Sequence, residues 1–136
     1  MRALVWSAWL LFASHATAVA AVDIAADCTG QRSGIDVRAC LTAQSVATDR
    51  ELERIEGRMR SRIALWEQPA THVQRAMAAF DADSAAYRRY RDAQCEFQTT
   101  AAADDDAAVR SACRISMDRE RVELLSGRIG WFDPGD

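Results

Sequence analysis

The sequence has 136 residues, enough for one domain but too short for two domains that each bury a core. Its charged fraction of 27% is that of an ordinary globular protein, and its formal net charge is −3. This acidic balance argues against a general nucleic-acid binder, because phosphate recognition depends on an excess of basic side chains. A mildly acidic protein is attracted weakly to basic partners instead.

Residues 1–20 have the plan of a secretory signal peptide. Arg2 supplies the positive start, an apolar run covers residues 3–13, and small residues occupy 16–21. We expect cleavage near residues 18–21, and loss of Arg2 would change the net charge from −3 to −4. The apolar run is too short to span a bilayer, and no second candidate follows. The sequence therefore predicts an exported protein, periplasmic or secreted, without stable membrane insertion.

The mature part of the chain contains four cysteines, at Cys28, Cys40, Cys95 and Cys113. An even number of cysteines in a small exported domain predicts two disulfides. A zinc site is not expected, because no CxxC pair occurs and His72 is the only mature histidine. Lipidation of Cys28 is not expected either, because Asp27 precedes it and the apolar run ends far upstream.

The first helix is predicted after an irregular lead-in over residues 21–35. From Asp36 to Pro69, apolar side chains recur every three or four residues with charged residues between them, which is typical of a long amphipathic helix. The stripe consists of Leu41, Ser45, Thr48, Leu52, Ile55, Met59, Ile63 and Trp66. Pro69 is expected to end the helix, because the residue before a proline is disfavoured in helical conformation.

Two further helices are predicted on either side of the segment TTAAADDD at residues 99–106. Thr71 would open the first of them, with Gln74 as its capping-box partner. Its inward face would contain Val73, Met77, Phe80, Ser84, Tyr87, Arg91 and Gln94 or Cys95. An aspartate at 104–106 would cap the last helix, which we expect to end at Gly127 or Gly130. The inward stripe of that helix would contain Val109, Cys113, Met117, Arg121 and Leu124.

The sequence thus predicts an all-α fold, a small antiparallel three-helix bundle over residues 36–128 with an irregular tail at 129–136. Antiparallel packing would gather all four cysteines at one end of the bundle, where geometry alone permits several pairings. We favour the local disulfides, Cys28–Cys40 and Cys95–Cys113, because each closes a short loop. On the chain-entropy model each would contribute about 3 kcal/mol.

The residues that catalysis or a metal site would require are not present in a suitable setting. His72 stands alone, and no serine or cysteine has the surroundings of a nucleophile. The three adjacent aspartates at 104–106 would diverge, so helix capping explains them better than metal binding. Glu51, Glu53 and Glu56 alternate with arginines at helical spacing, which predicts a solvated face linked by salt bridges. We therefore expect a protein that is not an enzyme and binds no cofactor.

The segment YRRYRDAQCEF at residues 87–97 is the most distinctive stretch of the chain. It accompanies three further features: eleven residues between the first two cysteines, DREL at 49–52, and Arg121 eight residues after Cys113. In this combination the chain resembles the LprI-type lysozyme inhibitor family of small exported bacterial domains. The resemblance extends over about residues 28–125. The family usually has tryptophan and glutamine where this chain has Tyr87 and Ser84.

The resemblance implies a protein that binds lysozyme and blocks its catalytic cleft. The alternative is a non-catalytic protein of the cell envelope that binds another exported protein or peptidoglycan. We interpret one part of the distinctive segment, with a residue of the last helix, as a structural motif: Tyr87, Arg91, Asp92 and Arg121. The predicted partner-binding residues are Arg88, Arg89 and Tyr90, since Tyr and Arg are enriched at binding hot spots. An arginine held on a rigid helix could pair with the two catalytic carboxylates of lysozyme.

Overall fold

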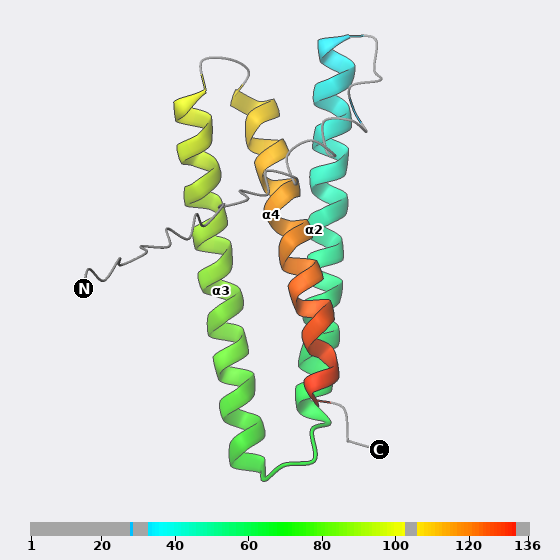
Figure 1. Cartoon of the computed structure of the whole chain (residues 1–136), viewed down its shortest axis with the longest axis vertical. Coiled ribbons are helices and arrows are strands. Elements are labelled where there is room, and N and C mark those ends of the chain that lie inside the picture. The colour runs from blue at the N-terminus through cyan, green and yellow to red at the C-terminus, as the bar shows by residue number, and fades with distance from the viewer. Residues whose placement is uncertain (1–27, 29–32, 103–105, 133–136) are drawn as a thin grey trace, which may run out of the picture.

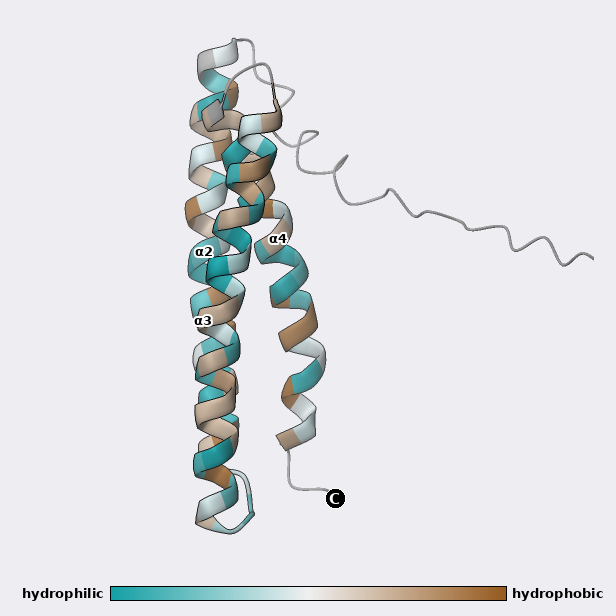
Figure 2. Ribbon diagram, turned by 90° about the vertical axis from the view of Figure 1, so that its left-hand side faces the viewer, coloured by the Kyte–Doolittle hydropathy of each residue, from teal (hydrophilic) through white to brown (hydrophobic). Residues whose placement is uncertain are grey.

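Three helices form an antiparallel bundle in the computed structural model, which describes Cys28, residues 33–102 and residues 106–132 (Figure 1). They are α2 (Gly34–Ala64), α3 (Ala70–Ala101) and α4 (Asp106–Arg128), followed by a short 3-10 helix, η1 (Ile129–Phe132). Helix α4 packs against both longer helices, and Figure 2 shows it on one side of the α2–α3 pair. The described residues contain no strand, and the predicted all-α three-helix bundle is confirmed.

The helix ends follow local chemistry. Ser33 caps α2, because its Oγ accepts a hydrogen bond from the backbone N–H of Asp36 at 3.2 Å. The capping box predicted at Thr71 is wrong, since α3 begins at Ala70 directly after Pro69. The carbonyl of Pro69 accepts hydrogen bonds from the backbone N–H groups of residues 72 and 73, so it closes the first turn before Thr71 could cap it.

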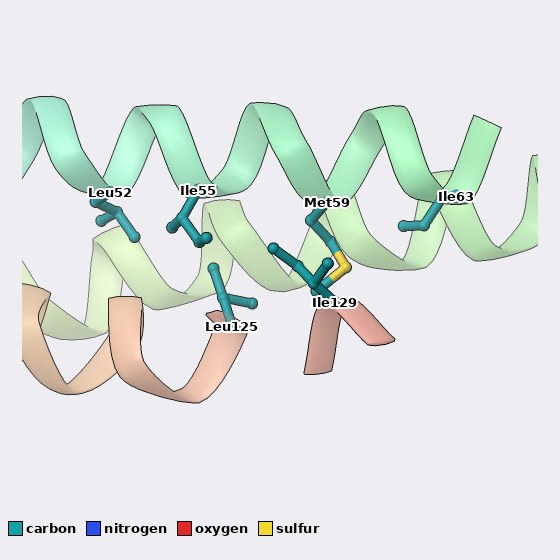
Figure 3. Close-up of a cluster of buried hydrophobic side chains, with 6 residues drawn as sticks. All are labelled: Leu52, Ile55, Met59, Ile63, Leu125 and Ile129. Carbon is teal, nitrogen blue, oxygen red and sulfur yellow. The ribbon is translucent and has the colours of Figure 1, made fainter. Parts of the chain in front are cut away.

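The main core lies between α2 and the end of α4 (Figure 3). It consists of the buried side chains Leu52, Ile55, Met59, Ile63, Leu125 and Ile129. Full burial of such a side chain contributes about 1.5–3 kcal/mol. Helix α3 adds only partly buried side chains here, among them Val73, Met77 and Phe80. The apolar periodicity of α2 therefore supplies most of the core.

The end of the chain is more ordered than the irregular tail that the sequence predicts. Residues 129–132 form η1, because Ile129 is buried in the core and Phe132 packs edge-on against the ring of Trp66, with centroids 5.2 Å apart. Trp131, in contrast, is 68% exposed. Residues 133–136 lie outside the described part of the chain.

The two disulfides hold the other end of the bundle. They join Cys28 to Cys40 and Cys95 to Cys113, so the predicted local pairing is confirmed. A second, smaller core forms beside them from Leu41 on α2 and Ile115 on α4, with Cys28. The predicted signal peptide and most of the lead-in lie outside the described residues. None of the described helices is long and apolar enough to cross a membrane.

Candidate functional site on helix α3 and its buried polar support

Arg91 joins all three helices through its guanidinium group. Its Nη1 donates to Asp49 Oδ1 on α2 at 2.7 Å and to both carboxylate oxygens of Asp118 on α4 at 2.9 Å. Its Nε donates to the neighbouring Asp92 at 3.2 Å. Arg91 is only 5% exposed and Asp118 is fully buried, so the bonds between these two side chains form away from bulk water, whereas Asp49 and Asp92 are partly exposed. Charge-assisted hydrogen bonds in such surroundings fix the rotation of α3 relative to its neighbours.

Asp118 also accepts a hydrogen bond from the Tyr87 hydroxyl at 2.9 Å. Burial raises the pKa of Asp118, while the bonds from Arg91 and Tyr87 oppose this shift. Burial and the bond to Asp118 likewise raise the pKa of Tyr87, so its hydroxyl stays protonated as a donor. Burial alone would lower the pKa of Arg91, but its bonds to Asp118 and Asp49 raise it.

Arg121 and Asp92 complete this polar cluster. The Arg121 guanidinium lies over the Tyr87 ring, 5.1 Å from its centroid, and forms an ion pair with Asp83. Asp92 accepts a hydrogen bond from Arg114 on α4 at 2.7 Å. The charges of Arg114 and Arg91 outweigh partial burial and lower the pKa of Asp92. The four residues of the predicted structural motif thus lie in one contiguous network between α3 and α4.

Glu56 differs from the predicted solvated face, because it is only 1% exposed. Its carboxylate accepts two hydrogen bonds from Arg88, from Nη2 at 2.8 Å and from Nη1 at 3.3 Å. Glu51 and Glu53 stay at the surface, although all three glutamates have the same kind of neighbours in the sequence. The reason is position: Glu56 and Asp49 are seven residues apart on the edge of α2 that faces α3.

The predicted partner-binding residues divide into two groups. Arg88 is engaged with Glu56, and its side chain is 38% exposed. Arg89 is exposed and makes no hydrogen bond or ion pair within the described part of the chain. Tyr90 is 61% exposed. Arg89 precedes the buried Arg91 by two residues, which places it about 200° around the helix, on the outer side of α3.

Two of the carboxylates that support α3, Asp49 and Glu56, are not predicted from the sequence as partners of its arginines. A usable signal was available for Asp118, which lies three residues after the buried Ile115 and three before Arg121, at a core position of α4. A carboxylate at a core position on one helix and an arginine at a core position on another indicate a buried pair. The described residues include no group of three or more His, Cys, Asp or Glu side chains placed to hold a metal ion.

These features define a small helical domain, stapled by two disulfides, in which buried charges join the helices and an arginine-tyrosine surface faces outward. Residues 25–125 match the family model described as Lysozyme inhibitor LprI. The chain therefore belongs to the LprI lysozyme inhibitor family, as its segment at residues 87–97 indicates. No curated protein and no solved structure matches the chain.

Proposed function

We propose that this protein is exported, binds lysozyme and blocks its catalytic cleft with the outer surface of α3. The observation that carries this proposal is membership of the lysozyme inhibitor family over residues 25–125. The acidic balance of the chain adds support, because long-range attraction would speed its encounter with a basic enzyme. The protein would act as a binding partner rather than as a catalyst.

Arg89 is the residue best placed to enter the cleft. Lysozyme cleaves its glycan with two carboxylates, and a guanidinium group can pair with carboxylates through several N–H donors. Three of the neighbours of Arg89 one turn away on α3 are the exposed alanines Ala85, Ala86 and Ala93, so side chains at those positions do not hinder approach. Since it has no partner in the described part of the chain, Arg89 can bind without breaking an existing ion pair.

Arg88 and Tyr90 would contribute beside Arg89. Tyr90 offers an exposed aromatic ring with few rotatable bonds, a residue type that is frequent at hot spots. Arg88 presents the exposed part of its side chain while its guanidinium stays on Glu56. The network around Arg91 would hold α3 in a fixed orientation, which reduces the entropy lost on binding.

The test is lysozyme-driven lysis of a cell-wall suspension in the presence of the purified mature protein. We expect inhibition by the unmodified protein and about tenfold or more weaker inhibition by Arg89→Ala. Arg50→Ala is the matched control, because Arg50 is an exposed arginine on α2 that also makes no hydrogen bond or ion pair within the described residues. Undiminished lysis at excess protein would contradict the proposal. Equal loss of inhibition in Arg89→Ala and Arg50→Ala would contradict a specific role of Arg89 in the proposed contact.

A further inference from the structure

The outer face of α3 carries a repeat that the bundle does not use. Small exposed residues recur every seventh position along it, at Ala79, Ala86, Ala93 and Thr100. A seven-residue spacing keeps side chains on nearly one line along a helix. Small side chains on such a line let a second helix approach closely, because the interaxial distance depends on the residues at the contact.

The two flanks of this line differ in chemistry, and each could pair with the same flank of a second copy of α3. Arg89 and Glu96 lie on one flank, and the aromatic residues Tyr90 and Phe97 lie on the other. Tyr90 and Phe97 are 61% and 68% exposed, which is unusual for large side chains on a helix that also packs in a bundle. Each flanking pair straddles Ala93, with one member three residues from it and the other four.

The positions of these residues on either side of Ala93 are compatible with a two-fold symmetry axis between two copies of α3. When two copies of α3 pack antiparallel about an axis through Ala93, residues on the same flank meet across the interface. Arg89 of each copy then faces Glu96 of the other, and Tyr90 faces Phe97. A parallel arrangement would place the charged flank against the aromatic flank and would lose both ion pairs. The contact is isologous, so it closes at a dimer.

We propose that a second copy of this chain docks on the outer face of α3, antiparallel, with the two-fold axis at Ala93. The charge complementarity supports this occupant: Arg89 has no partner in the described part of the chain. Among the described residues, the Glu96 carboxylate pairs only with the exposed Arg110, at 2.8 Å, and it is exposed enough to accept a second guanidinium group. One helix pair buries less than about 1,200 Å² in total, so the dimer should dissociate on dilution.

Self-association would also regulate the proposed function, and this point rests on that proposal. Arg89 and Tyr90 belong both to the dimer contact and to the proposed lysozyme contact. A protomer in the dimer could therefore not bind lysozyme through the same face. The monomer would be the inhibitory species, and the dimer would be a reserve that dissociates when the protein is diluted.

Sedimentation of the mature protein over a wide range of concentrations tests the dimer directly. We expect the mass to rise from one chain to two, and Arg89→Glu or Glu96→Arg alone to weaken association by about tenfold or more, because each places like charges opposite one another. The double variant Arg89→Glu/Glu96→Arg should regain association, since the exchange restores both ion pairs. A protein that stays monomeric, or a double variant no better than the single ones, would overturn the proposal. Helical circular dichroism checks that each variant is folded.

Cysteine cross-linking provides a second measurement that locates the axis. Only a residue on a two-fold axis meets its own copy, so Ala93→Cys should form a covalent dimer under oxidation. Ala86→Cys, one heptad away on the same line, is the matched control and should remain monomeric. Cross-linking of both variants alike, or of neither, would refute the antiparallel register. Neither measurement involves lysozyme, so failure of the dimer and failure of inhibition are distinguishable.

Discussion

Replacing Arg91 with methionine removes a guanidinium group on α3 that binds both α2 and α4. Methionine fills a similar volume, so the main loss is electrostatic: Asp118 stays buried, and among the described residues its carboxylate keeps only the Tyr87 hydroxyl as a partner. Breaking a buried pair by removing one partner costs about 3–5 kcal/mol. A domain of this size has about 5–15 kcal/mol of stability, so we expect its melting temperature to fall by about 15 °C or more.

The sign of the pH dependence follows from the same pair. Without Arg91, burial would hold the pKa of Asp118 above its ordinary value, about 3.9 in an unfolded chain. A carboxyl group with a raised pKa favours the folded state in its neutral form, so the Arg91→Met deficit should be smallest in acid. The deficit should grow as the pH rises through the pKa of the folded state.

Thermal unfolding followed by circular dichroism at several pH values measures both effects. The double variant Arg91→Met/Asp118→Asn is the control, because it removes the uncompensated charge together with its partner. We expect it to be more stable than Arg91→Met alone at neutral pH. If Arg91→Met costs less than about 1 kcal/mol, or if the double variant loses the sum of both single losses, the buried pair does not hold the helices as described.

Two further predictions concern the neighbours of Arg91. Arg88→Ala leaves the buried carboxylate of Glu56 without its main partner and should lower the free energy of unfolding in urea by about 2–3 kcal/mol. Arg89→Ala, at an exposed position, should change it by no more than about 0.5 kcal/mol. Equal losses of stability in the two variants would contradict the different environments of the two arginines. In the Tyr90→Phe variant, Tyr87 is the only tyrosine, and burial together with its bond to Asp118 raises its pKa. The absorbance change that marks ionisation of Tyr87 should therefore appear only when the helical circular dichroism is lost. Stability should decline above about pH 10, where the unfolded chain ionises. Ionisation of Tyr87 in the folded protein would refute the buried hydrogen bond.

The features that depend on local order along the chain were predictable. The apolar repeat of α2, a break near Pro69 and the even number of cysteines indicate a disulfide-stapled helical bundle, which the structure confirms, although α2 ends at Ala64, before Pro69 could end it. The prediction at Thr71 failed although it is also local, because the carbonyl of Pro69 closes the first turn of α3. The observed capping residue, Pro69, and the predicted one, Thr71, are two residues apart, and backbone hydrogen bonding in the folded chain selects Pro69.

The roles of the charged residues depend on the tertiary structure. Arg88 and Arg89 are adjacent and chemically identical, yet one binds the buried Glu56 while the other is exposed without a partner in the described part of the chain. The sequence by itself determined three helices, the presence of two disulfides and the family, because periodicity and cysteine spacing are local properties of the chain. Only the tertiary structure decided which charges are buried and paired, because that depends on how α2 and α4 are rotated against α3.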